Sequence, residues 1–157
     1  MKQALNDLDR ADRKILKLLQ EDGSITNAEL SERVNISPAT CHRRTKRLFD
    51  EGYITGVRAI IEPRKVGLDT LVMVGIVLDR STPESFSEFE KAAVGLKGVL
   101  QCDLVAGEFD YLLRIRVKDI DGFNNFHSKK LITLPGVRQA RSFFVLKEVK
   151  TAAPLEF

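Results

Sequence analysis

The sequence predicts an α+β protein built of two parts, a three-helix domain followed by a domain of β-strands and helices. Up to residue 52, apolar residues recur at the spacing of amphipathic helices, and capping residues divide them into three stretches. From residue 69 onward, short runs rich in Val, Ile and Leu alternate with two further helical stretches. The chain of 157 residues, 43% apolar and 30% charged, is long enough for two small domains with their own cores.

Two capped helices are predicted first. The first has Asp7 or Asp9 as its N-cap and ends where Gly23 is expected to take the left-handed conformation. Its apolar stripe consists of residues 8, 11, 15, 18 and 19. The second helix starts at Thr26, which can form a capping box with Glu29. The residues that this second helix turns inward are Ala28, Leu30 and Val34.

The third helix, in the stretch "SPATCHRRTKRL" from Ser37 to Leu48, is strongly basic. Ser37 is a good N-cap and Pro38 a good first helical residue. Its inward face is predicted to hold Cys41, Thr45 and Leu48. Arginines on the remaining surface can reach guanine edges and phosphates, and small hydroxyls near the helix start allow close approach to DNA. The residues predicted to contact DNA are Ser37, Thr40, His42, Arg43, Arg44 and Arg47.

The segment after this helix completes the N-terminal domain, which we predict to span residues 1–61. Gly52 is expected to stop the third helix, and the β-branched residues around Gly56 predict a short hairpin or wing. Three short helices with a tight turn before the basic one are typical of a helix-turn-helix, here a winged one. A basic run can also be only a solvated helix face, but the capped preceding helix, the Ser-Pro start and the wing favour nucleic-acid binding. Since the net charge is only +3, this affinity must come from local clustering.

The C-terminal domain is predicted to follow a linker at residues 62–68, where Pro63 and Gly67 enclose charged residues. The strands are expected at residues 69–79, 99–106, 111–117 and 137–149. One helix lies between the first two strands and another between the last two. This βαββαβ order is that of the ferredoxin-like fold, an antiparallel sheet with both helices on one face. We assign residues 69–150 to this domain and 151–157 to a C-terminal tail.

The last predicted strand carries apolar residues on both sides. The expected division is Val137, Phe143, Val145 and Val149 on one side, and Phe144 and Leu146 on the other. Helices cover only one face of a sheet of this kind. Apolar residues on both sides therefore indicate that the second face is buried too, most simply against another subunit.

Short motifs in both halves are specific in combination. The first half contains Leu8-Asp9, Asp12, Ile15-Leu16, Ser37-Pro38, Arg44, Leu48 and Gly52. The second half contains Gly107, Asp110-Tyr111-Leu112-Leu113 and Leu134-Pro135-Gly136-Val137. This combination, which spans nearly the whole chain, resembles the Lrp/AsnC family of bacterial and archaeal transcription regulators. The resemblance implies dimers formed through the sheets, further association often into octameric rings, and a small effector, usually an amino acid, bound between dimers.

The same resemblance places the effector near the "GEFD" turn and the start of the last strand. The residues that it implies are Gly107, Glu108, Asp110, Tyr111, Pro135, Gly136, Val137, Ala140 and Ser142. Open backbone amides at Gly107 would suit a carboxylate, and Glu108 and Asp110 would suit an ammonium group, so the turn fits a zwitterion. The turn alone is more simply an ordinary hairpin, so the site depends on the resemblance. The chain departs from the family at Thr45, usually Val, which is a mild loss on the buried face of the third helix. It also departs at Ala140, often Thr, and that difference near the effector site leaves the effector's identity open.

Other functions have little support in the sequence. His42 and His127 lie in different domains without a ligand at metal-binding spacing, and Cys41 and Cys102 are expected to be reduced thiols, so we expect no metal site. No Gly-x-Ser-x-Gly motif or phosphate-binding glycine loop is present, and we expect neither catalytic residues nor a cofactor. The longest apolar run, residues 71–78, is far shorter than the roughly 20 residues of a membrane helix.

The sequence therefore predicts a cytoplasmic regulator that stays off the membrane. Its expected partners are double-stranded DNA, a small-molecule effector that is an amino acid, and further copies of itself. Two alternatives stay open. One is an architectural protein that binds unrelated DNA with similar affinity, and the other is a small α+β enzyme, for which we find no convergent set of titratable groups.

Overall fold

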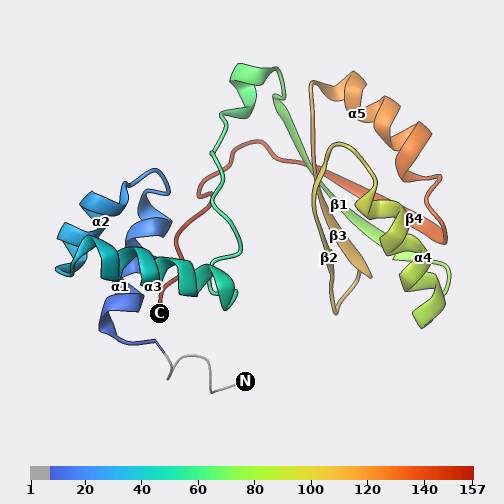
Figure 1. Cartoon of the computed structure of the whole chain (residues 1–157). Coiled ribbons are helices and arrows are strands. Elements are labelled where there is room, and N and C mark those ends of the chain that lie inside the picture. The colour runs from blue at the N-terminus through green and yellow to red at the C-terminus, as the bar shows by residue number, and fades with distance from the viewer. Residues whose placement is uncertain (1–7) are drawn as a thin grey trace. The chain divides into compact units, whose positions relative to one another are not determined.

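The computed structural model describes residues 8–157. The chain divides into two compact units (Figure 1). The helical unit consists of the described residues up to Ile61 together with residues 150–157, and the sheet unit consists of residues 62–149. The segment expected to be a separate tail is thus part of the helical unit. None of the described helices is both long and apolar enough to cross a membrane.

The helical unit contains α1 (Arg10–Glu21), α2 (Asn27–Val34) and α3 (Pro38–Asp50). Their starts follow the predicted caps because a cap is a local interaction. Asp9 accepts a hydrogen bond from the backbone N–H of Asp12, and Thr26 forms its capping box with Glu29. Asp7, the alternative cap, lies outside the described residues. The buried apolar residues of this unit are Leu8, Ile15, Leu16, Leu30, Val34, Cys41 and Leu48.

The end of α1 differs from the prediction. Gly23 does not take the left-handed conformation, and the helix ends instead at Asp22, which is extended with φ −143°. The backbone N–H of Asp22 donates to the carbonyl of Leu18 at 2.9 Å, and its side chain accepts from the Ser24 N–H at 2.8 Å. A Cβ at Gly23 would lie 2.7 Å from Cγ1 of Val57, so glycine is needed there for close approach. The predicted stop of α3 at Gly52, with φ +77°, is confirmed.

The segment after α3 does not form the predicted hairpin. Residues 54–62 contain no strand, although Ile54 is tied to α3 by its N–H, which donates to the Leu48 carbonyl at 3.1 Å. Gly56 lacks the positive φ that a tight hairpin turn requires. The segment therefore runs without strand pairing and leaves Val57, Ile60 and Ile61 exposed.

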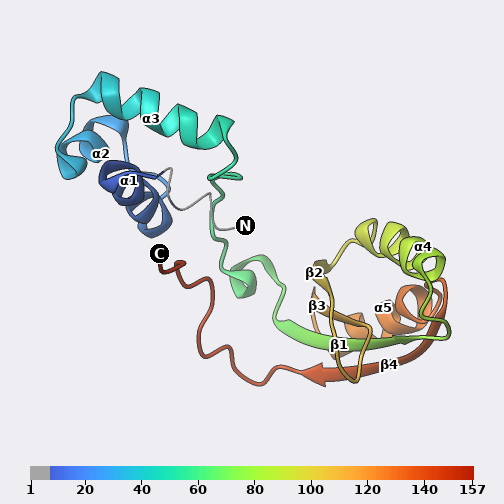
Figure 2. The same cartoon turned by 90° about the horizontal axis from the view of Figure 1, so that it is seen from below.

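The sheet unit has the predicted βαββαβ order. A short 3₁₀ turn at Pro63–Val66 leads into it. The elements are β1 (Thr70–Leu78), α4 (Pro83–Val94), β2 (Val99–Leu104), β3 (Tyr111–Val117), α5 (Ile120–Phe126) and β4 (Val137–Phe144). The strands form one antiparallel sheet in the order β2-β3-β1-β4, and α4 and α5 cover the same face of it (Figure 2). After α5 the chain continues through a wider turn at His127–Leu131.

The core of this unit lies between the sheet and the two helices. Alternate residues of the two central strands face the helices, which is the period of a β-strand. This core includes Val72, Val74, Ile76, Phe89, Tyr111, Leu113, Ile115, Phe123 and Phe126. The alternate residues on the other face of the sheet are less enclosed, as Phe143 shows with 52% of its surface exposed.

The last strand is shorter than predicted and contains an irregularity. Val77 pairs with Gln139 but Leu78 pairs with Val137, so Arg138 is an extra residue in β4. Val137 therefore packs against the helix-covered core, on the face opposite Phe143, and the prediction that they share a side is wrong. The strand ends at Phe144, whose ring contacts Phe123 on the helix side at 5.2 Å between centroids.

Candidate nucleic-acid interface and effector site

The exposed side of α3 is narrower than the sequence suggested. Cys41 and Leu48 are fully buried, as predicted, and Thr45 is partly buried beside them. The Oγ1 atom of Thr45 is buried and makes no hydrogen bond of ordinary geometry to the described residues. Exposed positions that remain on α3 form one outward strip. That strip consists of Ala39, His42, Arg43, Lys46 and Asp50.

Two of the predicted DNA contacts, Arg44 and Arg47, turn toward α1 instead. Nη1 of Arg44 lies 2.7 Å from Oδ2 of Asp9 and 2.9 Å from Oδ1 of Asp12. Nη2 of Arg47 lies 2.6 Å from Oδ2 of Asp12. The Asp12 side chain is only 1% exposed. One buried carboxylate thus holds two guanidinium groups of α3 and fixes how α3 lies on α1.

The ion pairs explain why Asp12 can be buried. A buried charge is tolerated when opposite charge and hydrogen bonds compensate it, and both are present here. The hydrogen bonds that Arg44 donates to the carboxylates of Asp12 and Asp9 raise the pKa of Arg44. The pKa of Asp9 is lowered, first by the backbone N–H of Asp12 and then by Arg44. The sequence carried a signal for this cluster, because Asp12 interrupts the inward stripe of α1 next to Ile15 and Leu16.

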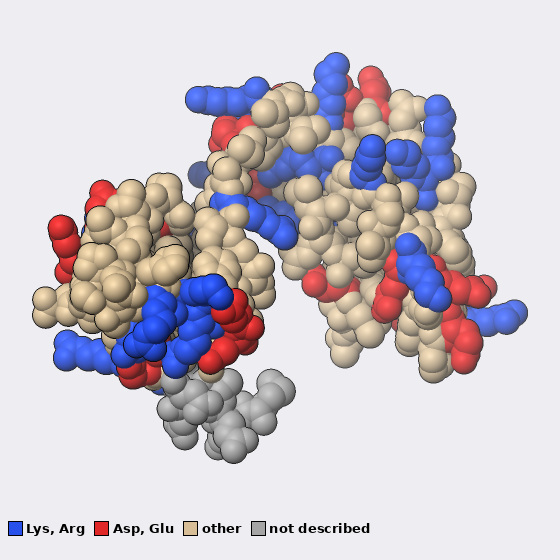
Figure 3. All heavy atoms as spheres, viewed as in Figure 1, with Lys and Arg blue, Asp and Glu red and all other residues tan. Residues whose placement is uncertain are grey.

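The other predicted contacts lie at the start and on the outward strip of α3. Ser37 caps the helix, its Oγ accepting from the Thr40 N–H at 3.3 Å and donating to Thr40 Oγ1 at 2.9 Å. His42 and Arg43 are exposed. Within residues 8–157, no hydrogen bond or ion pair holds the Arg43 guanidinium. Figure 3 shows Lys and Arg side chains gathered over the α3 side of the helical unit, with acidic side chains next to them.

In the sheet unit, the "GEFD" turn is fastened to β1 by Asp110. The backbone N–H of Asp110 donates to the Ile76 carbonyl at 2.8 Å, and its Oδ2 accepts from the Leu78 N–H at 2.8 Å. The Asp110 carbonyl accepts from Val105 N–H at 2.9 Å. These three hydrogen bonds show that Asp110 stabilises the hairpin itself. From the sequence, an ordinary hairpin was the simpler interpretation of this turn.

The other turn residues cover the open face of the sheet. Glu108 forms an ion pair with Arg141 of β4. The Arg141 guanidinium lies 5.8 Å from the centre of the Phe109 ring, and that ring lies against the backbone of Gly75. A Cβ at Gly75 would come within 2.5 Å of the Phe109 ring, so this stacking depends on glycine.

Several predicted effector residues face the opposite side of the sheet. Tyr111 is buried against α4, where its hydroxyl donates to Glu90 at 2.8 Å, and burial together with Glu90 raises the pKa of the Tyr111 hydroxyl. Ala140 and Ser142 pair with Ile76 and Val74 of the core. The structure therefore divides the predicted residues between the two faces of the sheet.

Pro135 and Gly136 line a separate pocket of about 250 Å³ at the end of the sheet. Gly136 has φ +71°, and its carbonyl accepts from the Asp79 N–H at 2.8 Å. The remaining lining residues, which sequence reasoning did not select, are Asp79, Arg80, Thr82, Glu84, Ser85 and Glu88. The sequence offered only a helix start at Thr82, because the pocket forms where distant loops meet.

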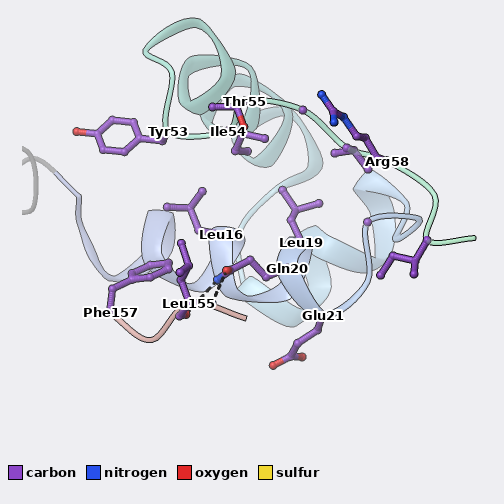
Figure 4. A pocket seen from close by; sticks show the side chains of 14 residues that line it. Leu16, Leu19, Gln20, Glu21, Tyr53, Ile54, Thr55, Arg58, Leu155 and Phe157 are labelled. Atoms are coloured by element: carbon purple, nitrogen blue, oxygen red, sulfur yellow. Dashed lines mark hydrogen bonds between the residues drawn. The ribbon is translucent and has the colours of Figure 1, made fainter. Parts of the chain in front are cut away.

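A larger pocket of about 330 Å³ lies in the helical unit between α1, the segment from Tyr53 to Arg58 and the residues near Phe157 (Figure 4). Gln20 binds the backbone of Leu155 twice, accepting from its N–H at 2.8 Å and donating to its carbonyl at 3.3 Å. Phe157 packs against the helical core. This pocket contains none of the predicted site residues.

Family models match both parts of the chain. Residues 8–55 match a winged helix-turn-helix DNA-binding domain. Residues 71–155 match the Lrp/AsnC ligand binding domain. The two matches together cover most of the described chain and correspond to its helical and sheet parts.

Curated relatives and solved structures agree with these matches. The leucine-responsive regulatory proteins of Klebsiella pneumoniae and Escherichia coli are 44% identical over 144 residues, which is 92% of this chain and 88% of theirs. A transcriptional regulator from Neisseria meningitidis, solved as a complex with L-Met, has a TM-score of 0.90 at 38% identity, with 95% of this chain and 96% of that chain covered. An AsnC family regulator from Agrobacterium tumefaciens has a TM-score of 0.89 at 30% identity, with 95% and 97% covered.

Proposed function

Because the chain belongs to the Lrp/AsnC family of DNA-binding transcription regulators, we propose that it recognises specific DNA sequences and that an amino acid alters this binding. The helical unit carries the DNA-binding function, and the sheet unit carries the effector-binding function. We place this activity in the cytoplasm, where the DNA is accessible.

The observation that supports the proposal is the Asp12 cluster beneath an outward strip on which Lys46 pairs with Asp50 at 3.1 Å and Arg43 stays available. Sequence reading requires side chains whose positions are fixed relative to the base edges. Arg44 and Arg47 form ion pairs with Asp12 and thereby hold α3 against α1. The Arg43 guanidinium, in contrast, has no partner among residues 8–157. A flexible basic helix that only neutralised phosphates would not need such an anchor.

This geometry separates the roles of the predicted DNA contacts. Arg43 is the base-reading residue, since arginine pairs bidentately with guanine. Ser37, Thr40 and His42 lie at the helix start and along its outward side, where they contact phosphates and sugars. Arg44 acts as a positioning residue, and Arg47, which remains 40% exposed, adds a phosphate contact.

The proposal of an amino-acid effector is supported by the ligand-binding family match and by the relative solved with L-Met. The site includes the Gly107–Asp110 turn and the loop at Pro135–Val137, with Tyr111, Ala140 and Ser142 supporting it from the core side. Acidic and basic groups, Asp79 and Arg80 in the pocket and the Glu108–Arg141 pair on the sheet, offer both charges that a zwitterion needs. We propose that a second copy of the chain completes the site.

Two measurements test the proposal. Selection of binding sequences from random DNA should give a defined site, and the protein should bind it at least about 10³-fold more tightly than unrelated DNA at physiological salt. Similar affinity for both would instead identify an architectural protein. A thermal-shift screen of the twenty amino acids should find one that stabilises the protein, by about 2.7 kcal/mol at a hundredfold excess over Kd. If none does, the effector is of another class.

A further inference from the structure

The outward face of α1 is a second basic surface, separate from α3. It consists of Arg10, Arg13, Lys14 and Lys17, which together line a shallow depression of about 410 Å³. Their spacing of three, one and three residues places them on one side of the helix. The acidic residue among them, Asp12, points into the core, where Arg44 and Arg47 neutralise it. We call these four residues the basic face of α1.

This arrangement of charge opposes the stability of the helix. Arg10 is the first residue of α1, where a positive charge is unfavourable for the helix dipole, although the carboxylates of Asp9 and Asp12 are favourably placed at the same end. The last turn has no basic residue and ends with Glu21, where a cation would be favourable. Like charges three and four residues apart also repel each other. Folding alone therefore does not explain the basic face, whereas a bound polyanion would relieve both conflicts.

The basic face points away from the side that carries the recognition helix. Asp12 faces α3, and Arg10, Lys14 and Lys17 lie on the other side of α1 from Asp12. Figure 2 shows α3 along one side of the helical unit and α1 on the other. A straight duplex bound at α3 cannot also follow the outward face of α1.

We propose that the basic face of α1 binds the phosphates of a second DNA segment, distinct from the segment that α3 reads. The inference rests on the proposed function only in that the protein binds DNA. A surface of four closely spaced arginine and lysine side chains on the outside of one helix fits the phosphate backbone of a duplex. Each helical unit then has two separate contacts with DNA, one through α3 and one through α1.

The test compares the wild type with two variants that lose the same net charge. One is Arg10→Gln/Lys14→Gln/Lys17→Gln, which leaves Arg13 in place because its Nε donates to the Leu8 carbonyl at 3.3 Å. The control is Lys91→Gln/Lys97→Gln/Lys129→Gln, three exposed lysines of the sheet unit. Lys17 also lies 5.9 Å from the centre of the Phe157 ring, so the double variant Arg10→Gln/Lys14→Gln repeats the test without that contact.

Binding is measured against salt on two DNAs. On a short duplex that contains only the specific site, all proteins should bind with the same affinity and salt slope. On long DNA, losing three phosphate contacts should reduce the slope of the triple α1 variant by about 3. Between 50 and 200 mM salt, the wild type should then lose about 40-fold more affinity for long DNA than this variant does. The control should follow the wild type.

Three results would overturn the inference. Equal slopes on long DNA would make the basic face only a solvated surface, and a reduced slope on the short duplex as well would place it on the same DNA as α3. Loss of binding to anionic lipid vesicles without any change on long DNA would assign the face to another polyanion. If the wild type itself showed no preference for any DNA site, the proposed function would fail instead, independently of these comparisons.

A stability measurement separates function from structure. Removing the repulsion and the unfavourable dipole contacts should raise the melting temperature of the α1 variant while its binding to long DNA weakens. A variant that bound less and also melted earlier would show that these side chains support the fold, which would contradict the inference.

Discussion

At the scale of single residues, neighbouring arginines of α3 have different environments and should respond differently to mutation. Arg43→Ala should weaken binding to the specific site by about 1–3 kcal/mol and relax the preference at one base pair, without changing stability. Arg44→Ala removes a partner of buried Asp12, so it should lower the free energy of unfolding. Gel shifts on matched and substituted sites, together with urea unfolding, measure both. If Arg43→Ala lost equal affinity for specific and random DNA, Arg43 would contact only phosphates.

Asp12 is the second residue whose role can be isolated. Asp12→Ala leaves Arg44 and Arg47 without their buried partner, and we expect a loss of about 3 kcal/mol in the free energy of unfolding. Asp9→Ala is the matched control, because it removes an N-cap and an exposed ion pair and should cost only about 1 kcal/mol. Chemical denaturation of the three proteins gives the comparison. Equal stabilities for the two variants would mean that the buried carboxylate does not anchor α3.

At the scale of helices and strands, local signals predicted the elements well. The caps at Asp9, Thr26 and Ser37 act within one turn of the chain, so the sequence alone identifies them. The strand at residues 111–117 was predicted with its true bounds, because buried and less buried side chains alternate along its first half beneath the covering helices. The failures depend on distant contacts. Gly23 was expected to end α1 in the left-handed conformation, but its lack of a side chain serves close approach to Val57 instead. The extra residue Arg138 places Val137 on the other face of the sheet.

The "GEFD" turn offers a prediction at this scale. Asp110→Ala removes the bond between its carboxylate and the Leu78 N–H, which should cost about 1–3 kcal/mol because a backbone donor loses its partner. If Asp110 also contacts the effector, the variant should lose the amino-acid-dependent thermal shift while binding DNA as before. Calorimetric titration with the amino acid found in the screen decides this. A destabilised variant with unchanged ligand affinity would limit Asp110 to the hairpin.

At the scale of the whole molecule, the sequence predicted the two sites to different extents. The residues of the DNA-binding helix are neighbours in the chain, so their periodicity indicates which sides are buried. The salt bridges that Arg44 and Arg47 form with Asp12 escaped prediction because Asp12 lies more than thirty residues away from both in the chain. The proposed effector residues come from separate strands and loops. Their division between the two faces of the sheet follows from β-sheet register and the irregularity in β4, which sequence spacing does not encode.

The open face of the sheet carries the last prediction. Phe143 is 52% exposed beside the Phe109 ring, with centroids 6.3 Å apart, in surroundings that also contain the Arg114–Glu148 ion pair. An exposed aromatic pair on a sheet face without covering helices favours contact with another copy of the chain. Light scattering at micromolar concentration should therefore give a dimer or a multiple of it, rather than the 17.7 kDa of one chain.

A single substitution tests whether that face forms the contact. Phe143→Asp should shift the protein toward the monomer, because it would bury an unpaired charge in the interface. Binding to a two-part DNA site should weaken with it, since two helical units joined in one particle bind a divided site more tightly than separate ones do. Val94→Asp, at an exposed position on α4, is the matched control and should leave the mass unchanged. If the wild-type protein were already monomeric, this result would contradict both the sheet-mediated dimer and an effector site completed by a second copy.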